Sequence, residues 1–202
     1  MAILDNGRPG PGYLAVELKI DKRLQASGPF NRGQVFSWDD SPELDDIMSD
    51  FWETLRKELN LPPSNRPPID RSKVGWLNCT IKFIVGENII FQQGLLVQYG
   101  TFWDWFYSVQ ELLHSEHEEE KTCSSGMESP ELCMRLSRTP YDPDLLEEGD
   151  PRYGCSMFIC VDTGVAAGEH VSGNGPGMFL YVGETAVLTF ARELLEEAHQ
   201  AG

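Results

Sequence analysis

The clearest pattern of hydrophobic and polar positions runs from Gly75 to Leu113. Between Trp76 and Val85 every second residue is apolar, which predicts a β-strand with one buried face. Gly86 follows, and it can take the positive φ that the first central residue of a tight hairpin turn requires. We therefore expect a hairpin whose return strand begins at Ile89, with a possible site for a bulge at Gly94.

An aromatic-rich helix is predicted after this hairpin. Thr101 is a good N-cap residue, and the carboxylate of Asp104 complements the exposed amides of the first turn. Large apolar residues then recur at helical spacing, which predicts that one face packs against the hairpin. These residues are Phe102, Trp105, Phe106, Val109, Leu112 and Leu113.

Similar patterns predict the other elements. Alternation predicts strands at Leu14 to Ile20, Leu132 to Leu136, Cys155 to Val161 and Met178 to Val182. A helix is predicted from Pro42 to about residue 60, because Ser41 caps it and an apolar stripe follows. A last helix is predicted from a Thr185 cap to Ala198.

The order of these elements predicts an α+β fold, with a mostly antiparallel sheet of about six strands and three helices packed on it. Glycine and proline in residues 1–12 predict a flexible lead-in, and residues 13–202 are expected to form a single domain. Acidic loops are expected at 114–131, as a mobile linker, and at 138–154. The hairpin and helix at 75–113 are echoed by two strands and a helix at 155–198.

Charge narrows the range of partners. The chain has 202 residues, with 16 basic and 32 acidic side chains, so its formal net charge is −16. This charge would repel nucleic-acid phosphates and anionic lipids, so we expect no direct nucleic-acid or membrane partner. A basic protein is the natural counterpart, although an acidic surface can also serve solubility alone.

Cysteine usage indicates a reducing compartment. The five cysteines are an odd number, and no secretory hydrophobic region begins the chain, so free thiols in the cytoplasm are expected. No apolar run approaches the roughly 20 residues that span a bilayer. Cys155 and Cys160 are five positions apart in a predicted strand, so they should face opposite sides and act as small apolar groups.

Candidate catalytic chemistry is sparse. His114 and His117, with Glu118 and Cys123 nearby, could share a metal, but histidines that cap a helix C-terminus are the favoured interpretation. The glycine-rich stretch at 173–177 lacks the Lys-Ser/Thr of a phosphate loop. Ser172 lacks a nucleophile elbow, with His170 the only nearby base. We expect no catalytic set, metal site or cofactor.

Acidic and aromatic side chains are instead the candidate partner-binding residues. Carboxylates would steer a cationic partner, and the outward aromatics of the central helix and its approach, Trp103, Tyr107 and Tyr99, would supply an apolar patch. The alternative is that the acids form a solvated face and the aromatics belong to the core. The candidates are Asp45, Asp46, Asp50, Glu53, Trp103, Tyr107, Glu118, Glu119, Glu120, Asp142, Asp144, Glu147 and Glu148.

The run Trp76-Leu77-Asn78-Cys79-Thr80-Ile81-Lys82, with its hairpin to Phe91 and a helix near Thr101, resembles the middle of the Wap-type immunity proteins. The strand and helix from Met178 to Ala198 resemble their closing unit. This resemblance implies a small cytoplasmic, non-enzymatic protein that neutralises toxins delivered between bacterial cells. The proline-rich segment before the hairpin and the helix at 42–60 depart from the family, and no binding residues carry over.

The leading hypothesis is therefore an acidic, non-catalytic binding protein, namely an immunity protein or inhibitor that occludes a basic protein partner such as a toxin. A hydrolase using a metal or scattered carboxylates, with His114, His117 or His170, is one alternative. Another alternative is a subunit of a nucleic-acid enzyme, or a phage-encoded inhibitor of such an enzyme. In that case the carboxylates of this protein would mimic phosphate groups. The sequence leaves the oligomeric state open.

Overall fold

The computed structural model describes residues 1–23, 66–67, 69, 75–117, 119–125, 132–141, 152–162 and 175–201. The chain divides into two compact units, Met1–Gly28 with Ile69–Gly202 and Pro29–Pro68, whereas the sequence predicted one domain from residue 13 onward. Residues 66 and 67 are the described part of the second unit, so the architecture below is that of the first unit. The helix predicted at 42–60 lies outside the described residues.

The first sheet is an antiparallel meander of four strands that leads directly into a helix. Its strands lie in the order β1-β2-β3-β4, and helix α2 begins where β4 ends. The elements are β1 (Ala2–Asp5), β2 (Leu14–Arg23), β3 (Trp76–Val85), β4 (Asn88–Gln98) and α2 (Tyr99–His114).

The second sheet repeats this arrangement later in the chain. Four antiparallel strands in the order β5-β6-β7-β8 are again followed by a helix, α4. The elements are β5 (Lys121–Ser124), β6 (Leu132–Pro140), β7 (Tyr153–Val161), β8 (Gly177–Val182) and α4 (Glu184–Gln200). The echo seen in the sequence thus covers a whole unit of four strands and a helix.

The α+β class is confirmed, but the detail differs from the prediction. Two sheets of four strands replace one sheet of about six, and the described residues contain two α-helices. The strands that the sequence missed are β1 and β5. The predicted flexible lead-in holds β1, where Ala2 and Leu4 are buried opposite β2, and a short 3-10 helix at Gly10–Gly12. The predicted mobile linker holds β5, a short polar strand paired with β6.

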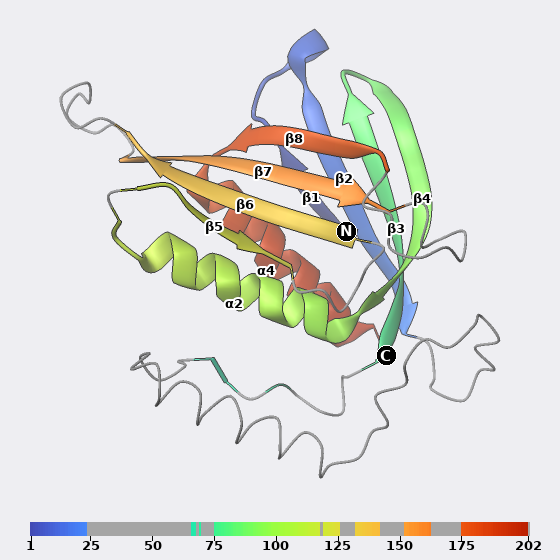
Figure 1. Ribbon diagram of the computed structural model, residues 1–202. Coiled ribbons are helices and arrows are strands. Elements are labelled where there is room, and N and C mark those ends of the chain that lie inside the picture. Colours follow the sequence, from blue (N-terminus) through green and yellow to red (C-terminus); the bar gives the residue numbers. More distant parts are fainter. Residues whose placement is uncertain are drawn as a thin grey trace. The chain divides into compact units, whose positions relative to one another are not determined.

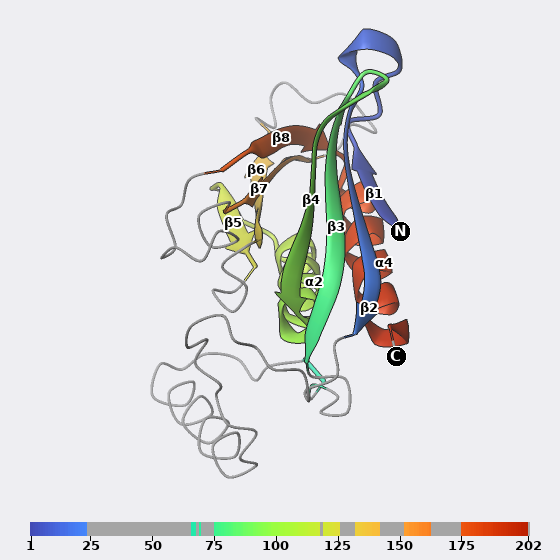
Figure 2. The same ribbon diagram turned by 90° about the vertical axis from the view of Figure 1, so that its right-hand side faces the viewer.

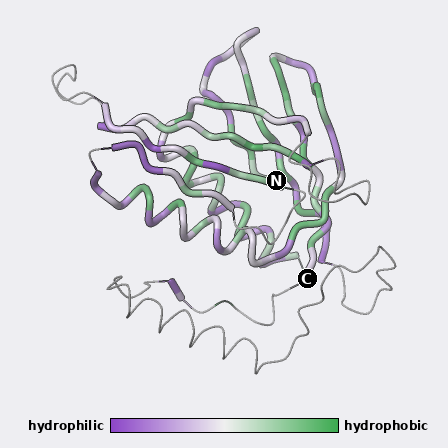
Figure 3. Tube along the Cα trace, in the orientation of Figure 1, coloured by the Kyte–Doolittle hydropathy of each residue, from purple (hydrophilic) through white to green (hydrophobic). Residues whose placement is uncertain are grey.

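The two helices lie side by side; α4 packs against the β1–β4 sheet, and α2 packs mainly against the β5–β8 sheet (Figure 1). Helix α4 contacts β1 and β2, and α2 contacts β5 and, less extensively, β6 and β4. The strands of the two sheets run in crossing directions (Figure 1), and the β5–β8 sheet lies to one side of the β1–β4 sheet in the turned view (Figure 2). Residues of both sheets and both helices form one buried apolar cluster. Along α2, hydrophobic and hydrophilic stretches alternate as the helix turns toward this core and away from it (Figure 3).

Arginines from the strands complete both helix ends. Arg23, at the end of β2, donates from Nε to the Ala201 carbonyl oxygen at 2.9 Å and from Nη2 to that of Ala198 at 3.0 Å. Its counterpart Arg138, in β6, donates to the carbonyl oxygens of Leu112 and Ser115 at the end of α2. A cation suits the negative end of a helix dipole, so these contacts fasten each helix to the opposite sheet.

The caps predicted for the two described helices, Thr101 and Thr185, were wrong, and the predicted Ser41 cap lies outside the described residues. Helix α2 begins at Tyr99, so Thr101 lies inside the helix and is buried, and Gln98 takes the N-cap position. The reason is that β4 continues into the helix without a loop, while the Tyr99 N–H donates to the Gly75 carbonyl oxygen at 2.9 Å. Likewise Gly183 precedes α4, and Thr185 lies within its first turn.

The hairpin turn was predicted correctly, but the bulge was not. Gly94 pairs in register with Thr80, and the register shift falls at the other end of the strands, between Phe83 and Ile84. Gly86 has φ of +61° as expected, and its N–H donates to the Tyr13 carbonyl oxygen at 2.8 Å.

We expect Gly86→Ala to lower the free energy of unfolding by about 1 kcal/mol, because a Cβ is disfavoured at this positive φ. Gly12→Ala is the matched control, since a Cβ at either position meets no atom within 4 Å and Gly12 has no positive φ. Urea denaturation of both variants measures the difference. Equal losses of stability would show that backbone conformation at the turn is not the cause.

Candidate functional site

The outer face of the β5–β8 sheet combines exposed apolar groups with almost no charge. Its residues alternate with the buried ones, and Arg135 is the only charged side chain that the four described strands place on it. These residues are Thr122, Ser124, Cys133, Arg135, Ser137, Thr139, Gly154, Ser156, Phe158, Cys160, Gly177, Phe179 and Tyr181. A protein of net charge −16 thus has a sheet face on which the described strands place no carboxylate.

Three aromatic side chains on this face, Phe158, Phe179 and Tyr181, form what we call the aromatic row. Their exposed fractions are 38%, 49% and 74%. Phe158 lies directly opposite Phe179 in the ladder, and the rings of Phe179 and Tyr181 meet edge to face, with centroids 5.2 Å apart. Large exposed apolar groups that gather on one face mark an interaction surface more often than scattered ones do.

Two glycines let aromatic rings lie against this sheet. A Cβ at Gly177 would come within 3.0 Å of the Phe158 ring, and a Cβ at Gly154 would come within 2.6 Å of the Tyr141 hydroxyl oxygen. Tyr141 is itself 48% exposed, and its N–H donates to the Arg152 carbonyl oxygen at 2.9 Å. The glycines therefore shape the face as well as the strands.

The alternation of apolar residues could not reveal the aromatic row, because both faces of β8 are apolar. Met178 and Leu180 are buried, and Phe179 and Tyr181 alternate with them. Hydrophobicity alone could not choose between the two sets. The neighbouring strand could have indicated which face is exposed, because Ser156 is polar and lies opposite Tyr181 once the two strands are paired.

Four of the predicted partner-binding residues are described: Trp103, Tyr107, Glu119 and Glu120. Trp103 and Tyr107 lie together on α2, with ring centroids 4.9 Å apart, but both are half-buried and Trp103 packs against the core. Tyr99, also expected to face outward, is buried at the start of α2. Glu119 and Glu120 are exposed. The others lie outside the described residues: Asp45, Asp46, Asp50, Glu53, Glu118, Asp142, Asp144, Glu147 and Glu148.

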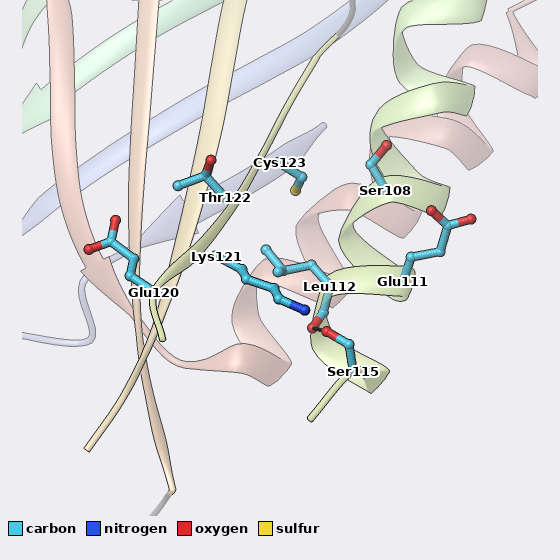
Figure 4. Close-up of a pocket in the computed structure, with 8 residues that line it drawn as sticks. All are labelled: Ser108, Glu111, Leu112, Ser115, Glu120, Lys121, Thr122 and Cys123. Atoms are coloured by element: carbon cyan, nitrogen blue, oxygen red, sulfur yellow. Dashed lines mark hydrogen bonds between the residues drawn. The ribbon is translucent and has the colours of Figure 1, made fainter. Parts of the chain in front are cut away.

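An open groove of about 470 Å³ lies between α2 and the start of β5. Glu111 projects from α2 on one side and Glu120 lies on the other, with the Lys121 side chain between them (Figure 4). Ser108 and Ser115 add hydroxyl groups to the lining. The lysine offsets part of the acidic charge, so the groove is polar and mixed in sign.

The two candidate metal-binding histidines contact main-chain oxygens. His114 Nδ1 lies 2.7 Å from the Gln110 carbonyl oxygen, the contact expected of a histidine at a helix C-terminus. His117 Nδ1 lies 2.6 Å from the Glu119 carbonyl oxygen, and its ring packs on Tyr153 with centroids 4.9 Å apart. Within the described part of the chain, no three His, Cys, Asp or Glu side chains gather as a metal site. His170 and Ser172 lie outside it.

All five cysteines are free thiols. Cys155 is buried, and burial, with a smaller contribution from Glu184, raises its pKa to about 11 despite the opposing effect of Arg138. It thus fits the expectation of a small apolar group. Cys160 does face the opposite side of β7, as expected, but it is only half-buried and lies on the outer face of the sheet.

Among the described residues, neither helix is long and apolar enough to cross a membrane. Comparison of the chain with protein-family models, with curated proteins and with solved structures finds no match. Its own residues and their geometry are therefore the basis for inferring a function.

Proposed function

We propose that this chain is a non-catalytic binding protein that occludes a basic protein partner, which docks on the aromatic row. The observation that carries the proposal is the presence of three exposed aromatic rings on one sheet face of a protein with net charge −16. The partner class we favour is a toxin, and the chain would then act in the cytoplasm as an immunity protein. The resemblance of residues 76–82 to such proteins and the free cysteines support this choice.

The chemistry of the face suits this role. Aromatic rings bury a large area with few rotatable bonds, and their π faces attract the arginine and lysine side chains that a basic partner presents. The described strands place no carboxylate on the face, so docking on them need not strip water from an acid that lacks a partner. Acids elsewhere on the surface supply a long-range field that attracts a cationic protein.

Association kinetics with a candidate basic toxin would test the proposal. We expect the association rate to fall about 10-fold or more as ionic strength rises from about 0.05 M to about 0.5 M, because salt screens the steering field. The dissociation rate should change much less. An association rate that does not respond to salt would contradict the proposal.

Paired charge reversals show whether one group of acids or the whole acidic surface attracts the partner. Glu119→Lys with Glu120→Lys, and the matched control Glu193→Lys with Glu196→Lys on α4, each change the formal charge by four units, from −16 to −12. If the field of the whole protein steers a partner to the aromatic row, both pairs should slow association to a similar, modest extent. A large loss confined to the first pair would move the contact to the groove between α2 and β5.

A further inference from the structure

Two of the free cysteines face each other across neighbouring strands. Cys133 in β6 lies directly opposite Cys160 in β7, both on the outer face of the sheet. Cys133 is exposed and Cys160 is half-buried. Within the described sheet pairings, no other two cysteines are ladder partners.

Backbone hydrogen bonds show whether Cys133 and Cys160 form a hydrogen-bonded or a non-hydrogen-bonded pair of the antiparallel ladder. The Val161 N–H donates to the Pro176 carbonyl oxygen beside β8, so the preceding residue, Cys160, directs its backbone groups toward β6. The Ser125 N–H donates to the Met134 carbonyl oxygen, so Cys133 directs its groups toward β7. The two cysteines therefore form a hydrogen-bonded pair, whose Cα atoms are typically about 5.5 Å apart.

This separation matches the distance that disulfides prefer, about 5.5 to 6 Å between Cα atoms. The Cβ atoms of such ladder pairs are about 5 Å apart, however, and a disulfide needs about 3.8 Å. The Cβ atoms must therefore approach each other, through local twisting of the strands, for the bond to form. Strained and accessible disulfides of this kind are readily reduced again.

We propose that Cys133 and Cys160 form a redox-active dithiol, which a low-molecular-weight disulfide such as oxidised glutathione converts reversibly into a cross-strand disulfide. The pair lies beside the aromatic row, because Cys160 is two residues from Phe158 and opposite Gly177. The dithiol chemistry depends on the ladder geometry alone and does not rest on the proposed function.

The exchange takes two steps. The Cys133 thiolate attacks one sulfur of the small disulfide, whose S–S bond breaks, and the departing thiolate takes a proton from water. Cys160 then loses its proton and attacks Cys133 Sγ, which expels the second small thiolate. Two protein thiols and one small disulfide become one protein disulfide and two small thiols, so two electrons pass to the small disulfide.

The exposure of Cys133 and the raised pKa of Cys160 indicate which cysteine attacks first and which completes the disulfide. Cys133 is the accessible sulfur, so it makes the first attack. Burial, and then the neighbouring Cys133, raise the pKa of Cys160 to about 11, so its thiol is protonated at neutral pH and poorly suited to react first. Once Cys133 carries the small thiol, Cys160 is held next to the bond that it must break.

The full native chain, incubated with oxidised glutathione and then alkylated, tests the proposal by intact mass and peptide mapping. One cross-link should join Cys133 to Cys160, and the other three of the five cysteines should remain free thiols. Excess reduced glutathione should restore all the thiols. A cross-link between other cysteines, a stable glutathione adduct without a cross-link, or no reaction would each overturn the proposal.

Single variants separate the two steps. Cys160→Ser should retain a stable glutathione adduct on Cys133, and Cys133→Ser should form adducts at least about 10-fold more slowly than the native chain. Cys123→Ser is the control, because its half-buried cysteine pairs with Leu136 and should leave the cross-link unchanged. Loss of the cross-link in this control would overturn the assignment of the pair. The native-chain mapping does not depend on any variant folding.

Discussion

Arg138→Met should destabilise the protein by about 3 kcal/mol, because the substitution leaves buried polar groups without their charged partner. Arg138 is 5% exposed, and its Nε donates to Glu184 Oε1 at 2.6 Å. Its Nη1 donates to the Leu112 carbonyl oxygen at 3.2 Å, and its guanidinium carbon lies 3.6 Å from the centroid of the Tyr153 ring. One side chain thus joins the end of α2, the start of α4 and two strands.

Arg192→Met is the matched control for this prediction. Arg192 is 57% exposed, and its Nε lies 3.9 Å from Glu196 Oε1 one helical turn away, so its loss should change stability by less than about 0.5 kcal/mol. Urea denaturation measures both variants. Arg138→Lys adds a second comparison, since it keeps the charge but loses the planar fork and should recover little stability. Equal effects of the two methionine variants would contradict the role of Arg138.

Strands with one wet face could be predicted from the sequence. β2, β3, β6 and β7 each alternate buried apolar residues with exposed or half-buried ones, and all four lie where the pattern placed them. Alternation of this kind follows directly from the geometry of a strand. Their assembly into two sheets could not be read in the same way, because pairing joins residues far apart in sequence, such as Leu14 with Val85.

The missed strands owe their structure to their neighbours. Lys121–Ser124 has no apolar period, and its ladder with β6 provides the order. Two alternating apolar residues, Ala2 and Leu4, are too few to predict a strand, yet both are fully buried because β2 and α4 lie beside them. Tertiary context decides such short segments.

The candidate site shows the same limit. The sequence pointed to Trp103 and Tyr107 as outward aromatics, and they do lie together, but both are half-buried on α2. The more exposed rings, Phe179 and Tyr181, alternate with the buried Met178 in an entirely apolar strand. Only the position of the core relative to the sheet determines which of these residues face solvent.

The double variant Phe179→Ala with Tyr181→Ala should weaken binding of the basic partner by about 1000-fold, the loss expected if each ring contributes about 2 kcal/mol as an interface anchor. Both side chains project outward and are 49% and 74% exposed, so the fold should persist, which circular dichroism would verify. Ile89→Ala with Ile90→Ala is the matched control, because those residues are 54% and 61% exposed on β4 of the other sheet.

The most direct test is a calorimetric titration of the basic partner into these two double variants and the native chain. A dissociation constant raised about 1000-fold for the aromatic pair, and changed less than about 3-fold for the isoleucine pair, is the predicted result. Native affinity in the Phe179 and Tyr181 double variant would contradict the assignment of the aromatic row as the docking surface.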